Sequence, residues 1–211
     1  MSTHTLAKMR RFLEARATSA EAAEERCEFC SVPVGAGHSH IVDIERRALL
    51  CACRPCYLLF TNPAAAGGRY RAVPERYARL DRDAFHLADW QALDIPVGIA
   101  FIFQNSGLGR PLAFYPSPAG VTESSLPLET WRELVANNPI LETLCPELEA
   151  LLIRRVPAGF DCYIVPIDVC YELAGRIRTR WRGFDGGEEA WLEIEEFFFN
   201  VRKRALSGGR R

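Results

Sequence analysis

Residues 27–56, CEFCSVPVGAGHSHIVDIERRALLCACRPC, hold five of the eight cysteines in the chain. Four of the five form two Cys-x-x-Cys pairs, Cys27/Cys30 and Cys53/Cys56, with 22 residues between the pairs. Each pair directs two thiolates at one point, and the segment between them is long enough to fold back and bring four sulfurs together. The sequence therefore predicts a metal site in which these four cysteines are the ligands.

The segment between the two pairs predicts a β-hairpin. Its apolar runs, 40–44 and 48–51, are separated by the charged Glu45-Arg46-Arg47. Arg54-Pro55 then suits the first turn of a helix that carries Cys56. A cysteine turn, a hairpin and a helix in this order are typical of a treble-clef or zinc-ribbon-like module. We expect three arginines to offset the negative charge of the thiolates: Arg46, Arg47 and Arg54.

Zinc is the preferred ion, because it accepts four thiolates in a tetrahedral arrangement. Rubredoxin-type iron also uses two Cys-x-x-Cys pairs, normally with a small residue, especially glycine, after the second cysteine, where Ser31 and Tyr57 stand here. Each of His38, His40 and Cys51 could replace one cysteine as a ligand, and this alternative stays open. Stable disulfides are not expected, since no secretory signal is visible.

The composition is that of a soluble globular protein with a real core, at 48% apolar and 25% charged residues over 211 positions. The 26 basic and 27 acidic side chains nearly cancel, which gives no support for general nucleic-acid binding. Residues 1–4 lack an apolar export core, and the apolar run 97–103 is too short to cross a bilayer. We therefore expect a cytoplasmic protein without a membrane span.

Periodicity and turn residues divide the chain into five parts. These are an N-terminal helical arm (1–26), the zinc-binding module (27–61), a linker (62–88), an α+β domain (89–206) and a disordered tail (207–211).

Within 89–206, two strand pairs predict two hairpins, with helices between and after them, which indicates an α+β fold. The predicted strands are 97–104, 111–116, 149–156 and 161–166. One predicted helix begins at Pro127, and three further helices are predicted at 140–144, 168–181 and 188–204.

No catalytic motif is visible: the sequence has no nucleophile elbow, phosphate loop or dinucleotide-binding glycine motif. Asp168 and Glu172 lie four apart on a predicted helix and could act as an acid/base or metal-binding pair, although a solvated helix face is commoner. The three later cysteines are expected to be buried and inert: Cys145, Cys162 and Cys170. We therefore expect no enzymatic activity.

The segment Arg69-Tyr70-Arg71, with Arg76 and Tyr77, interleaves positive charge and aromatic rings. Such a pattern can bind single-stranded nucleic acid. The near-neutral net charge favours instead a solvated connector whose tyrosines contact the core.

Several stretches resemble an uncharacterised bacterial family, whose members are often encoded beside genes for uptake-type nickel–iron hydrogenases. They are 27-CEFC-30, 53-CRPCYLLF-60, 95-IPVG-98, 114-FYPSPAG-120 and 181-WRGFDGG-187. The family pattern has no assigned activity, so the resemblance implies a setting and supplies no catalytic residues.

The leading hypothesis is a zinc-binding, non-enzymatic accessory protein that docks on a hydrogenase subunit or maturation factor. The alternatives are a rubredoxin-like iron electron-transfer module and a nucleic-acid-binding zinc-finger protein.

Overall fold

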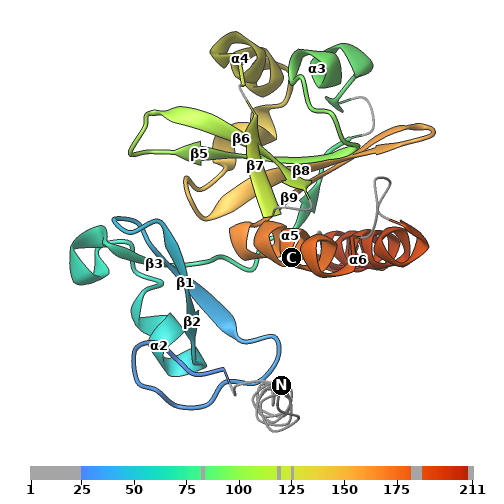
Figure 1. Ribbon diagram of the computed structural model, residues 1–211. Coiled ribbons are helices and arrows are strands. Elements are labelled where there is room, and N and C mark those ends of the chain that lie inside the picture. The colour runs from blue at the N-terminus through green and yellow to red at the C-terminus, as the bar shows by residue number, and fades with distance from the viewer. Residues whose placement is uncertain (1–24, 82–83, 118–119, 125, 182–186, 209–211) are drawn as a thin grey trace, which may run out of the picture.

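The structure is a computed structural model that describes residues 25–81, 84–117, 120–124, 126–181 and 187–208. It confirms the α+β class, with mixed helices and two antiparallel sheets of three and six strands (Figure 1). Most of the predicted N-terminal arm and the end of the predicted tail lie outside the described residues. No helix in the described part of the chain is both long and apolar enough to cross a membrane.

The smaller sheet contains the predicted hairpin, β1 (Ser39–Asp43) and β2 (Ala48–Ala52), which pair antiparallel with His40 opposite Cys51. The predicted helix follows as α2 (Arg54–Leu59). After the short 3-10 helix η1 (Ala65–Gly68), β3 (Tyr70–Ala72) pairs with the other edge of β1. The strand order is therefore β2-β1-β3.

The larger sheet has the order β4-β9-β8-β5-β6-β7. Both predicted hairpins, β5–β6 and β8–β9, are present, and pairing of β5 with β8 joins them. The strands are β4 (Ala78–Arg79), β5 (Ile99–Asn105), β6 (Arg110–Ser117), β7 (Gly120–Ser124), β8 (Glu149–Val156) and β9 (Gly159–Pro166).

Three strands were not predicted. After β6 the chain turns back, and β7, which starts at Gly120, pairs antiparallel with β6. Both β3 and β4 lie in the segment 62–88, predicted as a linker, so this segment contributes a strand to each sheet. Strand β4 is two residues long, and β7 (GVTES) contains one apolar residue, so neither shows an apolar alternation.

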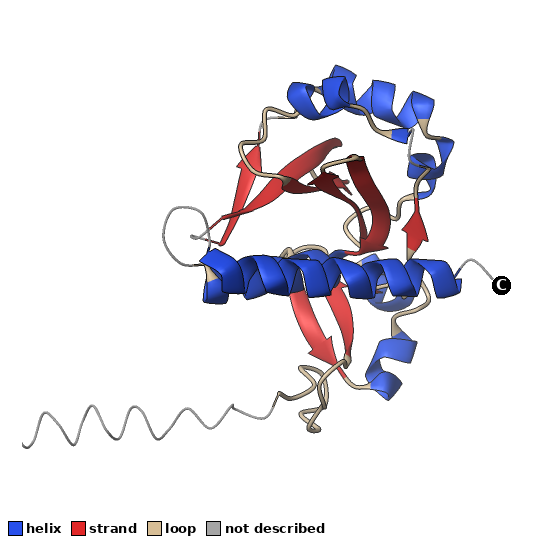
Figure 2. Ribbon diagram, turned by 90° about the vertical axis from the view of Figure 1, so that its right-hand side faces the viewer, coloured by secondary structure: helices blue, strands red, loops and turns tan. Residues whose placement is uncertain are grey.

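Helices cover both faces of the larger sheet (Figures 1 and 2). One face packs against α5 (Ile167–Arg180) and α6 (Gly187–Gly208). The other packs against α3 (Leu87–Ala92), α4 (Leu128–Asn137) and the 3-10 helix η3 (Pro139–Thr143). Side chains alternate along a strand, so Leu152 joins the α5/α6 core while Leu151 and Ile153 join the α3/α4 core.

The hairpin β1–β2 uses its two faces for two different cores. Val42 belongs to the core that contains α5 and α6, whereas Ile41 belongs to a separate small core with Cys27, Cys56 and Tyr57. Among the described residues, the small core has 5 buried apolar members, against 21 and 17 in the two cores of the larger sheet. The small core therefore offers little apolar burial to hold the N-terminal region together.

Candidate metal centre

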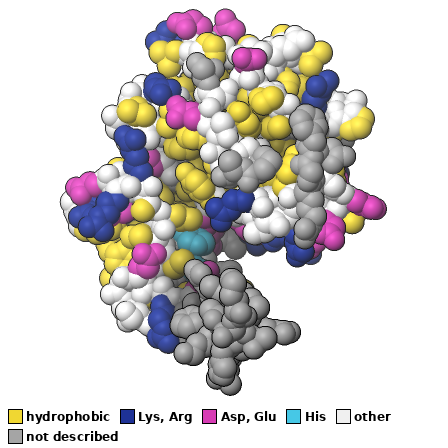
Figure 3. Space-filling model, viewed as in Figure 1, with side chains coloured by type: hydrophobic (Ala, Val, Ile, Leu, Met, Phe, Trp, Pro, Cys, Tyr) yellow, Lys and Arg dark blue, Asp and Glu magenta, His cyan; other side chains and the backbone are white. Residues whose placement is uncertain are grey.

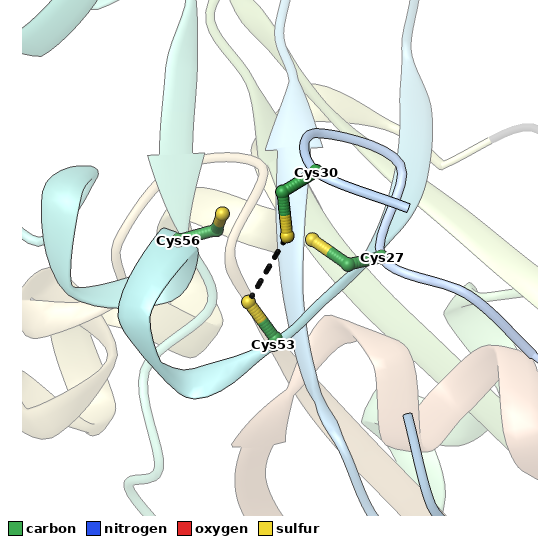
Figure 4. A group of neighbouring side chains, drawn as sticks. All are labelled: Cys27, Cys30, Cys53 and Cys56. Atoms are coloured by element: carbon green, nitrogen blue, oxygen red, sulfur yellow. Dashed lines mark hydrogen bonds between the residues drawn. The ribbon is translucent and has the colours of Figure 1, made fainter. Parts of the chain in front are cut away.

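The first cysteine pair lies in a tight turn before β1. The Ser31 amide donates to the Cys27 carbonyl at 2.8 Å, and the Cys27 amide donates to the Val32 carbonyl at 2.9 Å. Ser31 has a φ of 60°, in the left-handed region. These two bonds close the turn and bring the side chains of Cys27 and Cys30 to one side of it (Figure 4).

The second pair lies at the start of α2. Cys53 has extended backbone angles and is the N-cap, and Cys56 lies in the first turn. Pro55 is tolerated in this turn because the amide that it lacks would have no partner within the helix. The Tyr57 amide donates to the Cys53 carbonyl at 2.9 Å, which fixes the start of the helix and the direction of both thiols.

Glu28 connects the first turn to the end of β2. Its amide donates to the Cys51 carbonyl at 2.9 Å, and its Oε1 accepts a bond from the Cys51 amide at 3.0 Å. The Cys-x-x-Cys turn is thereby attached to the strand that leads directly into Cys53. This contact explains how two pairs separated by 22 residues of sequence meet in space.

The four sulfurs face one another (Figure 4), and all lie within 4.8 Å of each other. Cys30 Sγ and Cys53 Sγ are 3.6 Å apart. Zinc–sulfur bonds of about 2.3 Å in a tetrahedron place neighbouring sulfurs about 3.8 Å apart, whereas a disulfide needs about 2.05 Å. The geometry is that of a cluster that could hold a metal ion.

The thiols of the cluster differ in acidity. Burial acts to raise the pKa of Cys27, but the amides of Cys53, Phe29 and Cys30 outweigh it and lower that pKa to about 6. Burial and the neighbouring thiols raise the pKa of Cys56 to about 12. Because neighbouring thiolates repel, a divalent cation is what would favour the ionised form of all four.

The arginines expected to offset the thiolate charge have other partners. Arg54 pairs with Glu75 at 2.8 Å and lies over the Tyr57 ring, and Arg46 lies 4.0 Å from Asp43. Among the described contacts, neither these arginines nor Arg47 donates a hydrogen bond to a cysteine sulfur. Backbone amides supply the donors at Cys27 instead.

The three residues considered as substitute ligands form a second group of their own: His38, His40 and Cys51. One potential ligand atom of each lies within 4.8 Å of the others.

Asp168 and Glu172 do not act as a pair. Asp168 Oδ2 lies 2.8 Å from His40 Nδ1, whereas Glu172 pairs with Arg176 at 2.7 Å. Local sequence did not indicate the contact to Asp168, which joins residues 128 positions apart.

The later cysteines belong to neither group. Cys162 and Cys170 are buried in the larger sheet and α5. Burial raises the pKa of Cys162 to about 12 and raises the pKa of Cys170 well above its usual value. Cys145 is half-buried, and burial raises its pKa as well. Because a raised pKa keeps a thiol protonated at neutral pH, these residues are poor nucleophiles.

Two of the three arginines of the aromatic and basic segment, Arg69 and Arg76, form ion pairs within the fold. Arg69 donates to Asp43 at 2.8 Å, and its hydrogen bonds hold the pKa of that carboxyl below the usual range. Arg76 donates to both carboxylate oxygens of Glu149, at 2.8 and 2.9 Å. Paired cations are weak ligands for phosphate, so the contacts give no support to nucleic-acid binding by this segment.

A cavity of about 760 Å³ lies between the β1–β2 hairpin and the larger sheet, on the hairpin face that carries Val42. Its walls include the apolar Leu49, Phe103 and Tyr171, and charged residues stand among its lining. Figure 3 views this side of the molecule, where apolar side chains gather between the upper and lower parts. No local pattern in the sequence indicates this cavity, because its walls come from segments that are far apart in the chain.

Residues 26–205 match the family described as Family of unknown function (DUF5947). Neither the curated proteins nor the solved structures contain a match to the chain.

Proposed function

The chain belongs to DUF5947, a family of unknown function, and we propose that it is a non-enzymatic accessory protein in which Cys27, Cys30, Cys53 and Cys56 hold a structural zinc ion. The observation that carries the proposal is the convergence of four sulfurs within 4.8 Å. Four thiolates fill every position of a tetrahedral ion and leave none open for a substrate. This closed ligand set favours a structural role over a catalytic one.

The ion fastens the first turn, the hairpin β1–β2 and the start of α2 into a treble-clef-like module. Among the residues that the structure describes, only five buried apolar residues form the small core beside it, and two of these are the ligands Cys27 and Cys56. A structural zinc ion contributes on the order of 10–16 kcal/mol of apparent binding free energy in small fingers. The ion is therefore the main source of stability in this module.

Elemental mass spectrometry on protein expressed without added metal tests the identity of the ion. We expect a colourless protein whose zinc content falls by at least one equivalent in a Cys27→Ser, Cys53→Ser double variant. A red protein with visible charge-transfer bands, and iron in place of that equivalent, would establish the electron-transfer alternative instead.

A protein partner is supported by the surface of α6. Three apolar side chains at seven-residue intervals, Leu192, Phe199 and Leu206, are each more than half exposed. Seven residues are close to two helical turns, so the three lie along one side of the helix. Exposed apolar side chains that gather on one face are typical of protein interfaces. The sequence resemblance suggests that the partner is a hydrogenase subunit or maturation factor.

Affinity capture from native cells, with the full chain as bait, tests this partner. We expect a hydrogenase subunit or maturation factor among the captured proteins, and its loss with a Phe199→Glu bait. A Leu87→Glu bait is the matched control, because Leu87 is an exposed apolar residue on α3 and on a different surface. Recovery of no hydrogenase component by the wild-type bait would contradict the assignment.

A further inference from the structure

Beyond the tetracysteine cluster, the hairpin places a second set of metal-binding side chains together. His40 and Cys51 are directly opposite each other in the β1–β2 register. His38 lies two residues before His40, and alternate residues of an extended segment face the same side. The two imidazole rings are 4.7 Å apart, and one potential ligand atom from each of the three residues lies within 4.8 Å of the others.

Hydrogen bonds to Nδ1 define which nitrogen of each histidine is available. His38 Nδ1 lies 3.0 Å from the Gly35 carbonyl oxygen, and His40 Nδ1 lies 2.8 Å from Asp168 Oδ2. A carbonyl and a carboxylate only accept hydrogen bonds, so Nδ1 carries the hydrogen in both rings. Nε2 of each neutral imidazole is then left with its lone pair, as a metal ligand requires.

His38 Nε2 is buried and has no hydrogen-bond partner within the part of the chain that the structure describes. The side chain as a whole is only 9% exposed. A buried polar atom without a partner costs about 1–3 kcal/mol, and native proteins contain few of them. A metal ion bound by Nε2 would account for the position of this atom.

We propose that His38 Nε2, His40 Nε2 and Cys51 Sγ bind a second divalent transition-metal ion, of the zinc class. Two imidazoles and one thiolate are a ligand set that zinc and its neighbours in the first transition row accept. The group contains three ligands among the described residues, one fewer than a tetrahedral ion requires. The fourth position is open to water or an exogenous ligand, unlike the closed tetracysteine site.

Asp168 orients this site without binding the ion. Its Oδ1 accepts a bond from the Val169 amide at 2.9 Å, which holds the carboxylate at the start of α5, while Oδ2 faces His40. A carboxylate behind a histidine fixes the ring and strengthens the other nitrogen as a ligand. The carboxylate also balances charge, since one thiolate and two neutral imidazoles leave a divalent ion with a net charge of about +1.

The site lies where the two sheets of the molecule meet. His40 belongs to the hairpin of the smaller sheet, whereas Asp168 belongs to α5, which covers the larger sheet. In Figure 3, histidine is visible at the hollow between the lower and upper parts. The second ion would therefore stabilise the contact between the N-terminal module and the rest of the fold.

The experiment is to express the full chain in zinc-depleted medium with Co²⁺, and to measure cobalt content and absorption. We expect two cobalt equivalents in the wild type and one in each of His40→Ala and Cys51→Ser. The sulfur-to-cobalt absorption of both variants should fall by about a fifth, from five bound thiolates to four. His86→Ala is the matched control and should retain two equivalents, because His86 lies at the start of α3.

Asp168→Asn should retain two cobalt equivalents but bind the second about 10-fold or more weakly, because the histidine loses its carboxylate partner. The remaining tetrathiolate spectrum shows in each sample that the module is folded. If a variant loses both ions, its cobalt content does not report on the second site alone. The number of cobalt equivalents bound by the wild type then tests the proposal. One cobalt equivalent in the wild type, or two retained in both His40→Ala and Cys51→Ser, would overturn the second site.

Discussion

The two sheets of this protein are held together in different ways. The six-stranded sheet lies between two apolar cores, and its central strands β5 and β8 are buried on both faces. The three-stranded sheet shares one face with the larger core, and the small core on its other face has only five buried apolar residues in the described part of the chain. Apolar burial is sufficient to explain the first region, whereas we infer that the second depends on the proposed metal ion at Cys27, Cys30, Cys53 and Cys56.

The comparison teaches that the two regions should respond to different perturbations. Loss of the metal ligands should damage the N-terminal module and spare the larger sheet. A cavity made in the core of the larger sheet should destabilise that sheet and spare the N-terminal module.

Removal of metal ligands should have the largest effect. In Cys27→Ser with Cys30→Ser, the module should lose on the order of 10 kcal/mol, because two ligands of a structural ion are missing. Limited proteolysis should then cut within residues 27–61 while fragments of the larger sheet survive. Cys162→Ser is the control: Cys162 is buried in β9, so the change should destabilise the larger sheet and leave the metal content unchanged. Proteolysis confined to the larger sheet in the double variant would contradict the comparison.

A cavity in the larger core should have the next largest effect. Leu152 is fully buried in the middle of β8, and Leu152→Ala should lower the free energy of unfolding by about 3–5 kcal/mol. Denaturant unfolding measures the loss, and the zinc content of the folded protein should stay at the wild-type value. Leu192→Ala, at an exposed position on α6, should change stability by less than about 0.5 kcal/mol. Equal losses in the two variants would argue against a tightly packed sheet.

The ion pair that attaches the segment between the two sheets should have a smaller effect. Glu149 is 1% exposed and accepts bonds from Arg76 and from the Cys145 amide. Glu149→Ala leaves Arg76 Nε and the Cys145 amide without their carboxylate acceptor, while Arg76 keeps its bonds to Thr143. The change should cost about 2–3 kcal/mol by thermal or denaturant unfolding. In Glu129→Ala, which removes an exposed pair with Arg132, the cost should be about 0.5 kcal/mol or less. If the Glu149 variant lost no more than this control, Arg76 would not fix the segment.

Local sequence predicted the elements whose pattern is local. The hairpin of the module, the hairpins β5–β6 and β8–β9, and the helices α4, α5 and α6 follow from apolar periodicity and from Gly and Pro at their ends. The cysteine spacing also predicted which four thiols would converge. The hairpins and helices depend on residues that are close in sequence. The cysteine cluster could be predicted because two Cys-x-x-Cys pairs are a specific pattern for metal ligands.

The remaining features depend on contacts between distant segments. Nothing in the short sequence of β3 indicates that it pairs with β1, and the two faces of the hairpin cannot be assigned to two cores from β1 and β2 alone. The hydrogen bond between His40 and Asp168 likewise joins segments that are far apart in the chain. Periodicity placed Asp168 on a helix with Glu172, but only the fold shows that it faces the hairpin instead.

The most direct test of the central claim is hydrogen exchange, followed by mass spectrometry, before and after the metal is removed by a chelator. We expect amides in β1, β2 and α2 to lose most of their protection while amides in β8 and β9 keep theirs, because only the first set depends on the ion. Unchanged protection in β1 and β2 after complete metal removal would contradict the claim that four cysteines and one ion hold the module together.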